Sequence, residues 1–216
     1  HRPAVPPPPP HKENPLTPLA YHGDPAIKRK YLSRLRAHRK ADELVAGVGF
    51  NQNGKSVQGC AVGCTFDKYD HSRGPVEIGV PAVLIHLEDA IFEGLSRTGT
   101  RNEHLAFPES FLSIIRPGAD LSMVWPRFAL WMLDGPRGPI PAKARNHPTV
   151  KAAIDRVSSL YLAWIKTNVK PSACQWDAAG NAAKAAGAAG AAAGNAAGYK
   201  AWRAMRDKLL TLLKDT

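Results

Sequence analysis

The chain has 216 residues, 44% of them hydrophobic, and its three cysteines are too few for the disulfide framework of a small secreted domain. No segment reaches the roughly 18 apolar residues that a membrane-spanning helix needs, so we expect a soluble, cytoplasmic protein without a membrane partner. The formal net charge of +11 is concentrated in residues 26–48 and 135–216, and such basic surfaces attract phosphates or acidic proteins.

Residues 1–20 form the first region, a proline-rich segment that contains the run Pro6 to Pro10. Consecutive prolines lack backbone donors and favour the extended polyproline II conformation. We therefore expect an extended arm that serves as a tail or as a ligand for a partner.

Residues 21–134 follow as the expected helical core domain. Asp24 and Pro25 have the pattern of an N-cap and a first helical residue, and they predict a helix that continues to about Ala46. Apolar residues recur on one face of this segment, which indicates that it packs on a core.

A Gly/Cys-rich segment, residues 47–80, interrupts the helical pattern. Asn53 and Gly54 form a strong tight-turn signal between residues 48–50 and 57–66, so we expect a small β-hairpin in this otherwise irregular region. Residues 59–65 are small and apolar throughout, which indicates a close backbone approach or a buried turn and leaves strand and helix open. The predicted fold class is mainly α with a small β-hairpin.

Three further helices are expected in the core domain. The first begins at Pro81 and carries an apolar stripe, and the second begins at Pro108. The third is capped by Asp120 or Ser122, and Pro126 either kinks this helix or lies in its first turn.

The C-terminal part divides into three regions. Residues 135–148 are a Pro/Gly linker, and residues 149–171 are a helix that packs on the core. Residues 172–216 are predicted to form one long Ala/Gly-rich helix, opened by a capping box of Ser172 and Gln175. At 1.5 Å per residue this helix is roughly 60 Å long, which exceeds a compact domain.

Glycines along this helix indicate a packing interface. Gly190, Gly194 and Gly198 recur every four residues and, together with Gly187, allow a second backbone to approach along one ridge. We expect a protein partner or a second copy of the chain on this ridge, while the apolar end of the helix anchors it on the core or on that second copy. The alternative is a low-complexity tether that tolerates glycine.

Several motifs of the core region resemble those of an uncharacterised family of bacterial and phage-encoded proteins. The motifs are Tyr21-His22-Gly23-Asp24-Pro25 (YHGDP), Gly59 through Thr65 (GCAVGCT), and Leu87-Glu88-Asp89 with Ile91-Phe92-Glu93-Gly94-Leu95 (LEDxIFEGL). Similar proteins also carry an Ala-rich C-terminal tract. The resemblance covers the core region, and it implies kinship without implying an activity.

Two cysteines and one histidine are candidate metal ligands, because thiolate and imidazole bind tetrahedral zinc: Cys60, Cys64 and His71. A fourth ligand has to come from one of three residues elsewhere in the chain: His22, His38 or Cys174. Small cysteines in a Gly/Ala-rich turn are more often packing residues, so no cofactor is expected and zinc is the alternative.

The same cysteines are candidate catalytic nucleophiles. A thiol mechanism needs His71 or His38 to lower the pKa of the thiol, and Asp42 or Asp24 to orient that imidazole. The alternative for these histidines and carboxylates is an exposed charged face.

Basic residues of the first helix are candidates for contact with a polyanion: Lys28, Arg29, Lys30, Arg36, Arg39 and Lys40. Binding through them is sequence-independent and weakens as the salt concentration rises. No nucleic-acid motif and no interleaved exposed aromatic residues accompany the charge, so a solvated surface is the alternative.

Three functions follow from these features. The first is a non-enzymatic protein-interaction or assembly protein, associated with phage or prophage, that uses its long C-terminal helix for packing. The second is a thiol-dependent or zinc-containing enzyme or module centred on Cys60, Cys64 and His71, and the third is a non-specific nucleic-acid binder. We favour the first, because a long helix without catalytic residues takes up much of the chain.

Overall fold

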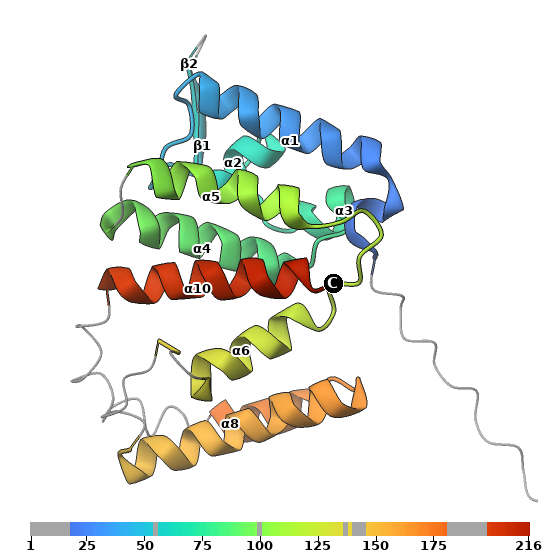
Figure 1. Cartoon of the computed structure of the whole chain (residues 1–216), viewed down its shortest axis with the longest axis vertical. Helices are drawn as coiled ribbons and strands as arrows, with labels where there is room; N and C mark the ends of the chain where they lie inside the picture. Colours follow the sequence, from blue (N-terminus) through green and yellow to red (C-terminus); the bar gives the residue numbers. More distant parts are fainter. Residues whose placement is uncertain (1–17, 54–55, 99–100, 136–137, 140–145, 181–197) are drawn as a thin grey trace, which may run out of the picture.

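A computed structural model describes residues 18–53, 56–98, 101–135, 138–139, 146–180 and 198–216. In this part of the chain the protein is mainly helical and has a small two-stranded sheet, as the sequence predicts. Figure 1 shows the helices stacked in layers, with α1 at one end and α8 at the other. Within the described residues no helix has the length and apolar character to span a membrane. The predicted arm lies almost wholly outside the described residues.

Helix α1 (Pro25–Lys40) begins where the sequence predicts. The Asp24 carboxylate accepts a hydrogen bond of 2.7 Å from a first-turn amide, which satisfies one of the unpaired N–H groups at the start of the helix. The prediction that α1 reaches Ala46 is wrong, because Asp42 adopts a left-handed backbone with φ 58° and the chain turns there. Residues 43–45 then run beside the end of the hairpin.

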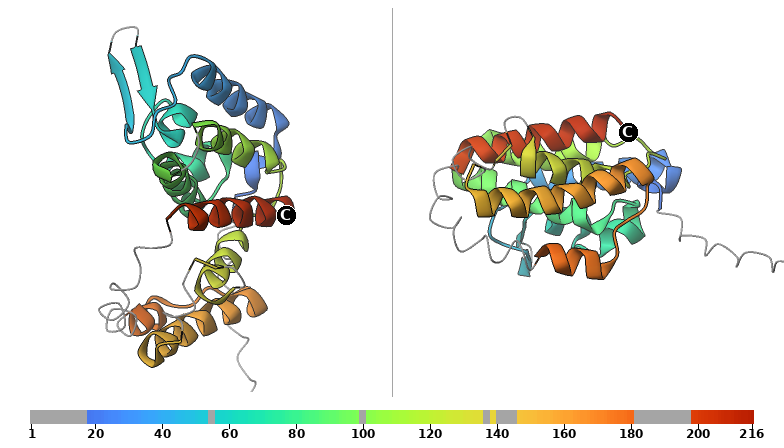
Figure 2. Two further views of the ribbon diagram at one scale, coloured as in Figure 1. Left: turned by 60° about the vertical axis from the view of Figure 1, so that its left-hand side comes forward. Right: turned by 90° about the horizontal axis from the view of Figure 1, so that it is seen from below.

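The predicted hairpin forms. Strand β1 (Phe50–Asn53) pairs in antiparallel register with β2 (Ser56–Gly59), and Figure 2 shows the hairpin projecting beyond the helices. Residues 59–65, whose small apolar sequence leaves strand and helix open, enter the buried helix α2 (Ala61–Phe66). A short apolar run does not distinguish a strand from a buried helix by periodicity alone.

The middle of the chain forms four helices: α3 (Arg73–Ile78), α4 (Ala82–Thr98), α5 (Arg101–Ile114) and α6 (Val124–Asp134). The prediction that Pro108 opens a helix is wrong, because α5 begins at Arg101 and continues through this proline. Pro126 lies in the first turn of α6, where the missing N–H removes no helical hydrogen bond. Met123, rather than Asp120 or Ser122, occupies the N-cap position of α6.

The core lies between α1, α4, α5 and α10 (Gly198–Lys214). Its largest fully buried side chains are aromatic: Tyr21, Phe66, Phe92, Phe107, Phe111 and Phe128. Leu209 and Leu213 of α10 are fully buried, so the apolar end of the C-terminal tract anchors on the core, as predicted. Helix α8 (Pro148–Thr167) packs on α6 and forms the outermost layer in Figure 1.

The single helix predicted over residues 172–216 is not confirmed. Residues 173–180 are helical and follow Ser172, whose amide donates to the Gln175 side chain at 2.8 Å as the capping box predicts. Helix α10 is a short helix at the other end of the tract. Three glycines of the predicted ridge, Gly187, Gly190 and Gly194, lie outside the described residues, and Gly198 is the first residue of α10.

Candidate functional site

The N-terminal end of the described chain forms a turn with a rare backbone conformation, η1 (Ala20–Gly23). Tyr21 and His22 have φ values of 52° and 51°, and Gly23 follows with 76°, so three consecutive residues are left-handed. The left-handed conformation costs a residue with a side chain roughly 1–2 kcal/mol. Contacts with the rest of the molecule must therefore hold this turn in place.

Backbone contacts hold the turn from two sides. The Ala20 amide donates to the Ala119 carbonyl at 3.0 Å, and the Gly118 amide donates to the Ala20 carbonyl at 2.7 Å. Gly79 approaches the Leu19 carbonyl so closely that an added Cβ would lie 2.0 Å from that oxygen. Gly79 also has a positive φ of 62°, so both the close approach and the backbone conformation favour glycine here.

The Tyr21 side chain anchors the turn in the core. It is fully buried, and its hydroxyl donates to the Leu112 carbonyl at 2.5 Å. Burial raises the pKa of this hydroxyl above its ordinary value. Lys28 donates to the Ser113 and Ile115 carbonyls at 2.5 and 2.7 Å, close to the same place. The carbonyls at the C-terminal end of α5, which have no helical partner, are thus satisfied from η1 and α1.

The turn places two exposed residues beside α3. The imidazole Nε2 of His22 lies 3.0 Å from the Val76 carbonyl oxygen. The Val76 residue is 77% exposed, and Leu19 is 48% exposed. We call Leu19, His22 and Val76 the η1–α3 patch. Figure 1 shows that α3 lies beside the start of the described chain.

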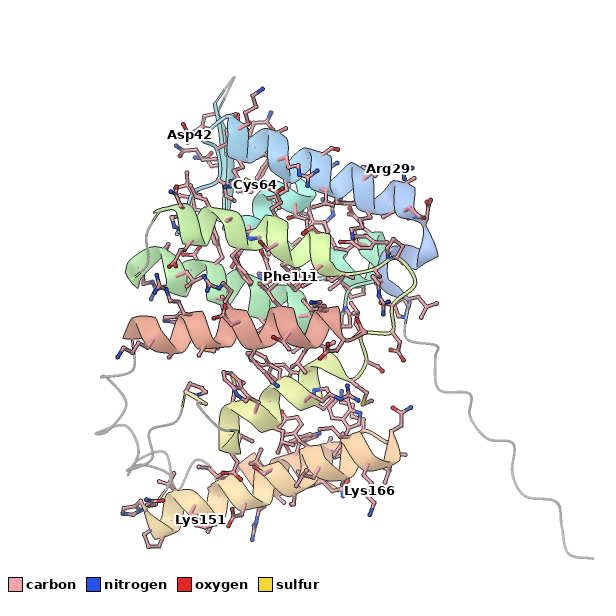
Figure 3. All side chains as sticks on the ribbon, in the orientation of Figure 1. Arg29, Asp42, Cys64, Phe111, Lys151 and Lys166 are labelled. Atoms are coloured by element: carbon pink, nitrogen blue, oxygen red, sulfur yellow. The ribbon has the colours of Figure 1, made fainter. Side chains whose placement is uncertain are left out.

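The two predicted thiols lie one turn apart at the beginning of α2. Cys60 is the N-cap residue, and its carbonyl accepts the Cys64 amide at 2.9 Å. Both side chains are free and almost fully buried. The Cys64 thiol donates to the Gly59 carbonyl at 3.3 Å. Figure 3 shows Cys64 on the inner side of α1. Cys64 therefore fills space beneath α1, while Cys60 lies near Asp89 of α4.

The surroundings of both thiols disfavour the thiolate. Burial, together with the charges of Glu43 and Asp67, raises the pKa of Cys64 to about 12. Burial also raises the pKa of Cys60 far above its ordinary value, and the carboxylates of Asp89 and Glu88 add to the increase. A reactive cysteine needs the opposite setting, an exposed thiol beside a cation.

His71 pairs with a carboxylate rather than with a thiol. Its Nε2 lies 3.1 Å from Asp89 Oδ2, and the Tyr69 hydroxyl donates to the same oxygen at 3.2 Å. The His86 ring stacks on the His71 ring with 3.8 Å between centroids. Burial and the neighbouring His71 lower the pKa of His86, against the opposite effect of Asp89. The cluster joins the loop before α3 to the face of α4.

His38 lies in a second cluster. Its Nδ1 is 2.7 Å from Glu43 and its Nε2 is 3.1 Å from Asp67, so a doubly protonated ring can donate to both carboxylates. Arg34 also pairs with Asp67, at 3.0 Å. The residue that faces the His38 ring is Glu43 rather than the predicted Asp42, which follows from the left-handed backbone of Asp42.

The remaining candidate ligands and orienting residues lie apart from these clusters. Cys174 is exposed near Ser172, at the far side of α8, and His22 belongs to the η1–α3 patch. Asp24 caps α1. Among the described residues, no group of three or more His, Cys, Asp or Glu side chains is arranged to hold a metal ion.

Half of the six predicted polyanion contacts are engaged within the fold. Lys28 caps α5, and Arg36 and Arg39 bind the two oxygens of Glu109 at 2.7 and 2.9 Å. The other three, Arg29, Lys30 and Lys40, are exposed, and Figure 3 shows Arg29 on the outer side of α1.

The η1–α3 patch was missed by sequence reasoning. Hydrophobic periodicity does not predict left-handed turns, and the only signals were Gly23, Gly79 and Gly118. The comparisons give no further guide, because no family model, no curated protein and no solved structure matches this chain.

Proposed function

We propose that the protein is a non-enzymatic interaction or assembly protein that binds a partner protein through the η1–α3 patch. The left-handed turn is the observation that carries this proposal. Residues in such conformations persist where the surrounding contacts fix them, and they are found often at binding and catalytic sites. The turn brings the His22 imidazole to the Val76 carbonyl and the Leu19 carbonyl to Gly79, and both Leu19 and Val76 are exposed.

The partner that fits this surface has an apolar side chain and a hydrogen-bonding group. Leu19 and Val76 offer apolar contact, and the partner can bond to the Nδ1 edge of the His22 imidazole, whose Nε2 faces the Val76 carbonyl. The turn is rigid, since Tyr21 anchors it and the backbone contacts of Ala20 fix it. A rigid surface loses little conformational entropy on binding, which favours affinity.

The setting of the cysteines gives less support to thiol chemistry. Both thiols are buried, and their raised pKa values leave little thiolate at neutral pH. The zinc proposal is tested by metal analysis of protein purified without chelators, where less than about one-tenth equivalent of zinc counts against it.

Nucleic-acid binding also has less support, since the fold engages Lys28, Arg36 and Arg39. Binding to single-stranded or duplex DNA that weakens steeply between low and moderate salt would favour this alternative.

The long C-terminal helix stays part of the proposal as a second packing surface. A continuous helix over residues 172–216, with its ridge of Gly187, Gly190, Gly194 and Gly198, would add a lengthwise contact with a partner or a second copy. The resemblance to bacterial and phage-encoded proteins suggests that the partner belongs to a phage or prophage assembly.

The experiment is affinity capture from the cells that make the protein, with quantitative mass spectrometry. We compare the wild type with Val76→Asp and with Val169→Asp, a matched control that is 67% exposed beyond the end of α8. A partner retained by the wild type and by Val169→Asp, and lost with Val76→Asp, supports the proposal. Identical sets of captured proteins for all three chains contradict it.

A further inference from the structure

The outer layer of the molecule contains a pocket of about 510 Å³ between α6, α8 and α10. Its apolar walls come from two helices, with Leu130 and Trp131 on α6 and Leu162 and Ile165 on α8. This volume lies within the range of about 300–1,000 Å³ that small-molecule sites occupy. Leu162 is 54% exposed, so the pocket is open at its rim.

Two cations line the same pocket. Arg127 of α6 is exposed and Lys208 of α10 is half-buried, and neither forms an ion pair with any described residue. Arg203, another cation of α10, is by contrast paired with Glu103 at 2.5 Å. The pocket also contains the carboxylate of Asp134, whose charge already acts on Lys151. The cations therefore exceed the anions in the pocket.

A buried hydroxyl completes the lining. Ser158 of α8 is only 7% exposed, and its Oγ has no hydrogen-bond partner among the described residues. Its neighbour Ser159 donates to the Arg156 carbonyl at 2.7 Å, the usual solution for a helical serine. A buried hydroxyl without a partner costs about 1–3 kcal/mol, and a ligand oxygen in the pocket would remove that cost.

We propose that this pocket binds a small carboxylic acid with an apolar body. The carboxylate lies between Arg127 and Lys208, where charge-assisted hydrogen bonds are available. The apolar body lies on Leu130, Trp131 and Ile165, and Ser158 bonds to an oxygen of the ligand. This site is separate from the η1–α3 patch, so a negative result for one of the two proposals leaves the other unaffected.

The test is isothermal titration calorimetry with three probes that separate charge from apolar area: decanoate, 1-decanol and acetate. We expect decanoate to bind and the other two probes to bind at least about tenfold more weakly, because decanol lacks the carboxylate and acetate lacks the apolar body. Decanol binding as tightly as decanoate would overturn the proposal, and so would the absence of any decanoate heat at millimolar ligand.

Variants assign the site to these residues. Arg127→Gln and Lys208→Gln each weaken decanoate binding by about tenfold, and Ser158→Ala weakens it less. Lys166→Gln is the matched control, because Lys166 is an exposed cation of α8 that points away from α6 in Figure 3. All four are checked for an unchanged thermal midpoint. Binding that is the same in wild type, Arg127→Gln and Lys208→Gln overturns the assignment.

Discussion

At the residue scale, a small number of buried polar side chains decide how the N-terminal turn and helix α4 are held. Tyr21 holds the left-handed turn through one hydrogen bond to the Leu112 carbonyl. Glu88 lies in α4 with 4% of its surface exposed, next to Asp89, and it is the most deeply buried carboxylate described. Such residues affect stability strongly, because the interior does not solvate an unpaired polar group.

Tyr21→Phe removes the hydroxyl and leaves the Leu112 carbonyl without its partner. We expect the free energy of unfolding, measured by urea titration, to fall by about 1–3 kcal/mol. Tyr69→Phe is the control, because the Tyr69 residue is 51% exposed and water can replace its hydroxyl at Asp89. Equal losses in the two variants would show that the Tyr21 hydrogen bond does not hold the turn.

Glu88→Gln and Glu109→Gln should respond to pH with opposite signs. Burial, with the Asp89 charge, raises the pKa of Glu88 well above its ordinary value, so the contribution of Glu88 to stability falls as the pH rises past about 4.3, its pKa in the unfolded chain. The hydrogen bond from Arg36, with the charges of Arg36 and Arg39, lowers the pKa of Glu109 against the effect of burial. Glu109 therefore stabilises the fold at a pH above its pKa in the unfolded chain, and this stabilisation is lost as the pH falls.

The measurement is the free energy of unfolding of both variants and the wild type from pH 4 to pH 8. At pH 7 we expect Glu88→Gln to be more stable than the wild type and Glu109→Gln to be less stable. Both differences shrink toward pH 4, where the carboxyl groups are protonated in the unfolded chain. A Glu88→Gln variant that is less stable at pH 7 contradicts the raised pKa.

Thiol accessibility provides a third prediction. With Ellman's reagent at pH 8, only the exposed Cys174 should react rapidly in the folded protein, because Cys60 and Cys64 are buried and their pKa values are raised. All three cysteines should react after unfolding. Rapid reaction of Cys60 or Cys64 in the folded protein, identified by mass spectrometry, would restore the thiol mechanism.

At the element scale, sequence patterns predicted helices better than they predicted how helices end. The cap of Asp24 with Pro25 and the apolar stripe of α4 were sufficient to predict those helices. The end of α1 was not predictable, because it depends on the left-handed turn at residue 42. The helical form of α2 was not predictable either, because it depends on tertiary contact between Gly63 and the Gly49 carbonyl. Local propensity is weaker than such contacts.

The contact between α4 and α10 depends on one glycine. A Cβ on Gly94 would lie 2.2 Å from the Trp202 ring, which is too large to move aside within the core. We therefore expect Gly94→Ala to lower the free energy of unfolding by about 1–3 kcal/mol, the usual cost of overpacking.

Gly180→Ala is the matched control for this prediction, because no described atom lies within 4 Å of its added Cβ. We expect it to be neutral or stabilising by up to about 1 kcal/mol, since alanine is the better helix former. Thermal unfolding of the two variants distinguishes the cases, and a stable Gly94→Ala protein would mean that α10 does not lie against α4.

At the scale of the whole molecule, the candidate sites combine residues that are distant in the chain. The pocket joins α6, α8 and α10, and the η1–α3 patch depends on Gly79 and Gly118. Single-chain patterns do not report such proximity, so the sequence drew attention to Cys60, Cys64 and His71 instead. Of these, Cys60 and His71 both lie near Asp89, while Cys64 faces Glu43 and Asp67.

Site-specific photo-crosslinking tests the central proposal most directly. A benzophenone amino acid replaces Val76 in one protein and Val169 in another, and each protein is irradiated in the cells that make it. We predict a discrete crosslinked protein from position 76, competed by wild-type chain, and none at the same mass from position 169. The absence of any adduct from position 76, or the same adduct from both positions, would contradict a partner-binding η1–α3 patch.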